Sequence, residues 1–111
     1  MLTELQRRAG DAVTAAIQEM GGKIVFRQVL GMQYVLGEAS CSRGEVRVYL
    51  YEYGLSVDYR VGENNRVFEL VDFESQDAMI RALCESLQIE IAQGPYPFFP
   101  PPAQDEDVAP R

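Results

Sequence analysis

Arg47, Tyr49, Tyr51 and Tyr53 stand at every second position of one stretch that is otherwise rich in valine and leucine. Successive side chains of a β-strand point to opposite faces, so these four side chains share one face of the predicted strand. Tyrosine and arginine provide large, rigid contact areas and are enriched where interfaces carry their binding energy. The pattern predicts a protein-binding face. The alternative is that the tyrosines only stabilise the sheet by cross-strand stacking.

The next stretch adds two charged residues to the same predicted face. Residues 55–61 alternate again, with Ser56, Asp58 and Arg60 on one side. The opposite side carries apolar and aromatic residues that we expect to be buried, namely Leu55, Val57, Tyr59 and Val61. Asp58 and Arg60 therefore join the predicted protein-binding residues.

A separate, proline-rich segment follows residue 93 and ends in an acidic run. All six prolines lie between Pro95 and Pro110, and such a segment favours an extended polyproline conformation. Tyr96, Phe98 and Phe99 are too many aromatic residues for an inert linker. Either they fold back onto apolar surface of their own domain, which we favour, or they dock a protein partner. The predicted organisation is one domain over residues 1–93 and an acidic tail over residues 94–111.

Residues that usually carry catalysis or bind metals are sparse in this chain. It contains no histidine, the commonest general base and metal ligand near neutral pH. Cys41 and Cys84 lie far apart in the sequence, unlike the close pairs of zinc or redox sites, and are expected to be free thiols. Asp72 and Glu74 match no cation-binding loop. We therefore predict a protein that is not an enzyme and uses no cofactor or metal.

The net charge of −7 comes entirely from the C-terminal part of the chain. Residues 67–111 hold nine acidic and two basic residues, whereas residues 1–66 hold eight of each. This imbalance disfavours direct binding to nucleic acid, because attraction to phosphates dominates such binding. It favours a basic protein partner, since a field of one sign speeds encounter with the opposite sign. The alternative is that the acidity only keeps the protein in solution.

No membrane attachment or export is expected from the sequence. No apolar run approaches the roughly 20 residues that a transmembrane helix needs. The first residues lack the basic-then-apolar layout of a signal peptide. We therefore expect a cytoplasmic protein.

Two amphipathic helices flank the predicted strands. Thr3 and Gln6 form a capping box before an apolar stripe that predicts a helix over residues 4–20, and Ser75 caps a second helix that ends at Gly94. Five stretches between the helices have strand character: residues 23–30, 33–39, 45–53, 55–61 and 66–73. This order predicts an α+β fold of two layers, with an antiparallel meander of four or five strands and helices on one face. The expected core includes Val46, Val48, Leu50, Val57, Ile80, Leu83 and Leu87.

The passage from the last strand to the second helix, Val67-Phe68-Glu69-Leu70-Val71-Asp72-Phe73-Glu74-Ser75, resembles that of small bacterial immunity proteins, which neutralise toxins. The size, acidity and element order are also similar to those of acidic chaperones of secretion systems. The first resemblance implies an inhibitor that occludes the basic active site of a toxin or other protein. The second implies a homodimer that masks a cargo protein. A phage-encoded inhibitor of a host defence complex is a third alternative, and none of the three implies a catalytic residue.

Overall fold

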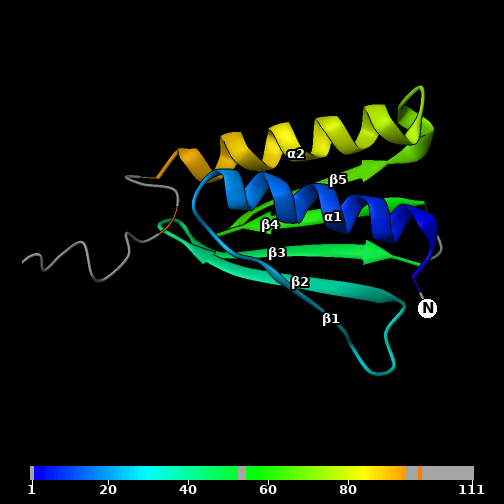
Figure 1. The fold of residues 1–111 in the computed structure, drawn as a ribbon, viewed down its shortest axis with the longest axis horizontal. Helices are drawn as coiled ribbons and strands as arrows, with labels where there is room; N and C mark the ends of the chain where they lie inside the picture. Colours follow the sequence, from blue (N-terminus) through cyan, green and yellow to red (C-terminus); the bar gives the residue numbers. More distant parts are fainter. Residues whose placement is uncertain (1, 53–54, 95–97, 99–111) are drawn as a thin grey trace, which may run out of the picture.

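The protein consists of a five-stranded antiparallel sheet and two helices, as seen in a computed structural model that describes residues 2–52, 55–94 and 98 (Figure 1). The elements are α1 (Glu4–Glu19), β1 (Val25–Gln28), β2 (Tyr34–Cys41), β3 (Gly44–Tyr51), β4 (Ser56–Val61), β5 (Asn64–Glu69) and α2 (Gln76–Ala92). The strands form a meander in the order β1-β2-β3-β4-β5. Both helices lie on the same side of the sheet, α1 over β3 and α2 over β4 and β5. The predicted α+β class and two-layer arrangement are confirmed.

Three details of the predicted elements were wrong. The last strand ends at Glu69 instead of Phe73, because a 3₁₀ turn over Leu70–Asp72 leads the chain up to α2. The second strand, predicted over residues 33–39, continues through Ser40 and Cys41. Leu55 is 56% exposed instead of buried, since it adopts a positive φ of 48° in the turn before β4.

The core lies between the sheet and the two helices. All seven side chains of the expected core, from Val46 to Leu87, are less than 9% exposed, and they pack with Tyr59, the largest fully buried side chain. The Tyr59 hydroxyl lies 2.5 Å from the Ser86 hydroxyl of α2, so its polar end is satisfied. This contact fixes α2 above β4.

Hydrogen bonds at both ends of the molecule join helices to strands. The predicted capping box between Thr3 and Gln6 is present, and the Gln6 side chain also donates to the backbone carbonyl of Leu50, at 2.9 Å. At the opposite end, the Glu90 carboxylate of α2 accepts hydrogen bonds from Arg43, in the β2–β3 turn, and from Asn64, at the start of β5. These contacts hold α2 against two strand turns.

Phe98 belongs to the tail but packs against the core. Its ring covers Gly22, just after α1, so closely that a methyl group built on Gly22 would lie 2.5 Å from ring atoms. Tyr96 and Phe99 lie outside the described residues. For Phe98, the contact supports the fold-back alternative.

Shortening a side chain in the centre of the core should destabilise the protein strongly. Leu83→Ala should lower the free energy of unfolding by about 2–5 kcal/mol, as large-to-small core substitutions do. Ile89→Ala on the exposed side of α2 is the matched control and should change it by less than about 0.5 kcal/mol. Urea denaturation of the two variants measures both values, and equal effects would contradict the assignment of the core face.

The contacts of Glu90 predict a loss of stability in acid. Hydrogen bonds from Asn64 and then Arg43 lower the pKa of Glu90 below its ordinary value of 4.5. The contribution of Glu90 is therefore fully present above pH 4.5 and is lost as the pH falls through its lower, folded-state pKa. In urea denaturation, the stability difference between the wild type and Glu90→Gln should shrink from about pH 7 to about pH 3. The exposed Glu85→Gln is the control, and a pH-independent difference for Glu90→Gln would contradict the prediction.

The position of Phe98 can be tested by a double-mutant cycle with Gly22. Phe98→Ala should lower the free energy of unfolding by about 1–2 kcal/mol, because the ring is partly buried. Gly22→Ala should destabilise the wild type by displacing the ring but should cost less in the Phe98→Ala background. Thermal or urea denaturation of the four proteins measures the coupling, and a coupling of zero would mean that Phe98 does not cover Gly22.

Candidate functional site

Three tyrosines gather on the sheet face that points away from the helices. Tyr49 and Tyr51 come from β3, and Tyr34 comes from β2, directly opposite Tyr51 in the register. The ring of Tyr34 meets the ring of Tyr49 edge-on, with centroids 5.2 Å apart, and that of Tyr51 at 5.4 Å. We call Tyr34, Tyr49 and Tyr51, together with Arg47, Asp58 and Arg60, the tyrosine face.

The register of β3 and β4 brings the predicted charged residues into this face. Asp58 lies opposite Tyr49, and Arg60 lies opposite Arg47. All three tyrosines are partly exposed, whereas the alternating Val46, Val48 and Leu50 are buried. The predicted assignment of the two sides of β3 is therefore correct.

Polar contacts hold the edges of the aromatic cluster. The Tyr51 hydroxyl donates a hydrogen bond to the Asp58 carboxylate. Burial raises the pKa of Asp58 above its ordinary value of 3.8, this hydrogen bond opposes the rise, and the charge of Glu69 adds to it. The pKa of Tyr51 is raised above 10.0 by burial and by the nearby Asp58 charge. Tyr51 therefore remains a neutral donor at physiological pH.

Arg47 is the charged residue most closely integrated with its neighbours. A hydrogen bond with Tyr49 and the charge of Glu45 raise the pKa of its guanidinium above its ordinary value. Its Nη2 lies 2.8 Å from the Glu45 carboxylate, and its Nε lies 3.9 Å from that of Glu38. Arg60 contacts the backbone instead: its Nε donates a hydrogen bond to the carbonyl of Gly62, at 3.1 Å.

The tyrosine face and the acidic side chains of α2 lie on opposite sides of the sheet. The sheet face carries charges of both signs: Arg27, Arg47, Arg60, Glu38, Glu45, Asp58 and Glu69. By contrast, Asp77, Glu85 and Glu90 belong to α2, on the opposite side of the sheet. A partner at the tyrosine face would therefore meet mixed charge, while the carboxylates of α2 lie across the sheet from it.

Tyr34 is the member of the cluster that the sequence did not reveal. It stands next to Val35 and Leu36, so apolar residues fall on both faces of β2 and its alternation is obscured. Only the register of β2 against β3 shows that Tyr34 lies directly opposite Tyr51. Three predicted binding residues, Tyr53, Tyr96 and Phe99, lie outside the described residues. Phe98 packs on the core beside Gly22.

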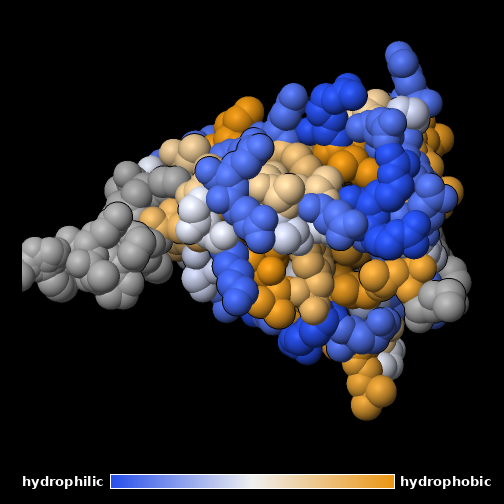
Figure 2. All heavy atoms as spheres, in the orientation of Figure 1, coloured by the Kyte–Doolittle hydropathy of each residue, from blue (hydrophilic) through white to orange (hydrophobic). Residues whose placement is uncertain are grey.

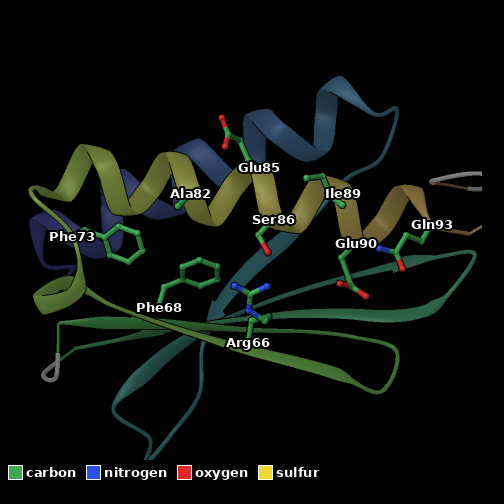
Figure 3. A pocket seen from close by; sticks show the side chains of 9 residues that line it. All are labelled: Arg66, Phe68, Phe73, Ala82, Glu85, Ser86, Ile89, Glu90 and Gln93. Atoms are coloured by element: carbon green, nitrogen blue, oxygen red, sulfur yellow. The ribbon is translucent and has the colours of Figure 1, made fainter.

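A second surface lies between β5 and α2, where an open groove of about 530 Å³ is lined by both elements (Figure 3). Phe68 and Phe73 stack at 6.2 Å on its floor, and Arg66 lies over the Phe68 ring at 5.3 Å. Ile89, on α2, borders the groove and is 63% exposed. In the sequence, the signal for this groove is Ile89, an apolar residue that does not belong to the buried stripe of α2.

A third exposed apolar feature is the β1–β2 turn, which projects at the bottom of Figure 2. Leu30 at its tip is 99% exposed, and Met32 is exposed beside it. A positive φ of 80° at Gly31 permits the tight turn between them.

Metal-ligating side chains do not gather in the part of the chain that the structure describes. Among residues 2–52, 55–94 and 98, no group of three metal-ligating side chains is found. Cys41 is buried, and burial raises the pKa of Cys84 to about 11, so its thiol stays protonated at neutral pH. Neither helix in the described part is long and apolar enough to cross a membrane. The described residues do form exposed contact surfaces, namely the tyrosine face and the groove between β5 and α2.

Comparisons of the chain with protein-family models, with curated proteins and with solved structures found no match.

Proposed function

We propose that this chain is a non-enzymatic protein-binding module whose partner docks on the tyrosine face. The observation that carries the proposal is the contact of three partly exposed tyrosine rings on a sheet face that neither helix covers. A sheet needs only one buried face for stability, so the second face is available for contact.

The cluster is suited to binding because its side chains are already held in place. Tyr34 contacts both other rings, and hydrogen bonds fix Tyr51 to Asp58 and Tyr49 to Arg47. Ordering a side chain on binding costs about 0.5–1.5 kcal/mol, and rings that are ordered beforehand avoid most of that cost. Tyrosine also offers a hydroxyl at the rim of an apolar contact.

The charge pattern describes the partner. The net charge of −7 attracts a basic protein and speeds encounter. Within the contact, Arg47 and Arg60 require acidic or carbonyl groups, while Asp58 requires a donor. A cytoplasmic immunity-type inhibitor fits this description: it would cover the basic active site of a toxin and block it sterically.

A dimeric chaperone for a secreted cargo protein is the second candidate. The groove between β5 and α2 favours it, because an aromatic floor and the exposed Ile89 suit an apolar segment of a cargo. Such a cargo would occupy the groove and leave the tyrosine face free.

Removing one ring should distinguish the two candidates. The wild type, Tyr49→Ala and Val71→Ala are immobilised and used to capture partners from the native host, and affinities for the purified partner are then measured by calorimetry. Tyr49→Ala should weaken binding by about 2 kcal/mol or more, about 30-fold, as loss of a central aromatic residue does. Val71→Ala, whose side chain is 84% exposed on the 3₁₀ turn, is the matched control and should bind normally.

Equal affinity of Tyr49→Ala and the wild type would overturn docking at the tyrosine face. Melting temperatures of all three proteins establish that the variants are folded. The association rate should also fall between low and physiological salt, because surface charges are screened over about 10 Å. A rate that is independent of salt would show that the acidity does not steer the partner.

A further inference from the structure

β5 is an edge strand with an open outer side. The two-residue turn at Gly62 and Glu63 closes the β4–β5 hairpin, and Val61 pairs with Asn64. Pairs alternate between hydrogen-bonded and non-hydrogen-bonded along such a hairpin, so Asn65, Val67 and Glu69 turn their peptide groups away from β4. Within the described residues, no further strand follows β5 in the sheet. Its outer side therefore presents unpaired donors and acceptors.

The two edges of the sheet differ in how they are protected. β1 has four residues and β5 has six. Natural edge strands are usually kept short or carry lysine, proline or a bulge, which prevent pairing with another chain. Neither strand contains lysine or proline, so the edges differ in length, and the longer β5 carries the 55% exposed Val67 at its centre. β5 is thus the edge that is open to pairing.

The sequence of β5 is complementary to itself when it runs antiparallel to a second copy. With Val67 opposite the second copy's Val67, Asn65 lies opposite Glu69, and Arg66 lies opposite Phe68. These pairs join an amide to a carboxylate and a guanidinium to an aromatic ring, the latter as already seen within one chain. Two neighbouring registers keep the side chains on the same faces. One opposes Arg66 to itself, and like charges opposite each other repel. The other opposes Glu69 to Val67 and so loses the pair of Asn65 with Glu69.

The position of α2 fits the same arrangement. α2 packs over β4 and β5 and runs nearly parallel to the strands (Figure 1). With strands about 4.8 Å apart, two copies of α2 related by a two-fold axis between the β5 strands would be about 10 Å apart. Packed helices lie 8–10 Å apart, so the second helix would cover the groove beside Ile89 (Figure 3).

The geometry points to a homodimer in which the β5 edges of two copies pair antiparallel and form one ten-stranded sheet. The two-fold axis is perpendicular to the sheet, so all four helices lie on one side. Both tyrosine faces then lie on the other side, uncovered and next to each other. This inference adds to the proposed function a bivalent binding surface, but its test does not depend on any partner.

Lysine substitutions of two matched valines test the dimer. Val67 on β5 and Val25 on β1 are 55% and 56% exposed. They lie on the two edge strands, and their side chains point to the same face of the sheet. Sedimentation of the purified full chain over a concentration series up to the millimolar range should show a dimer for the wild type and for Val25→Lys. Val67→Lys places two like charges opposite each other at the axis and should weaken the dimer at least tenfold. Raising the salt concentration should strengthen the wild-type dimer, because two chains of charge −7 repel each other.

A disulfide trap measures the register independently. Opposed residues in a hydrogen-bonded antiparallel pair have Cα atoms about 5.5 Å apart, within the range that disulfides span. Val67→Cys should form an intermolecular disulfide on a non-reducing gel, whereas Val25→Cys should not. The native thiols give little background, since Cys41 is buried and the raised pKa of Cys84, about 11, keeps it protonated.

Three results would overturn the dimer: a wild type that is monomeric at all concentrations, equal effects of Val67→Lys and Val25→Lys, or equal cross-linking of the two cysteine variants. A monomeric wild type whose partner binding is lost in Val67→Lys would assign the edge to a strand of that partner. Tyr49→Ala should leave the dimer intact. Failure of the dimer and failure of the tyrosine face are therefore separate outcomes.

Discussion

The one-sided covering of the sheet is the constraint on which the rest of the structure depends. Val46, Val48 and Leu50 must alternate with Arg47, Tyr49 and Tyr51, because a strand turns successive side chains to opposite faces. Both helices cover the valine and leucine side. The second face is then left to residues that tolerate water, and tyrosine combines contact area with a hydroxyl that water can reach.

Much of this arrangement could be predicted from the sequence because its signals are local. Thr3 and Gln6 mark the start of α1, and strict alternation in β3 separates its two faces. Long-range pairing is not a local signal. The place of Tyr34 beside Tyr51 depends on the register of β2 and β3, which apolar residues on both sides of β2 conceal. The end of β5 was predicted wrongly because Leu70 and Val71 have strand composition but lie in a 3₁₀ turn.

The net charge of the chain and the individual charges of the tyrosine face act on a partner in different ways. Summed over the chain, the charge is −7, yet the tyrosine face holds charges of both signs, Arg47 and Arg60 beside Asp58. Long-range attraction depends on the sum and is screened by salt, whereas contact specificity depends on individual pairs. A basic partner would thus be drawn by α2 and the C-terminal part of the chain but selected by Arg47, Asp58 and Arg60.

The contact between Tyr59 and Ser86 links the two surfaces. It holds α2 over β4 and β5, which leaves the groove at Ile89 uncovered on the helix side. A pairing of two β5 edges would bury that groove without touching Tyr34, Tyr49 or Tyr51 on the other side. Two tyrosine faces on one rigid sheet would bind a two-fold symmetric partner with a high effective concentration, since the second contact becomes intramolecular. The open edge of β5 would therefore double the binding surface by pairing two copies of the chain.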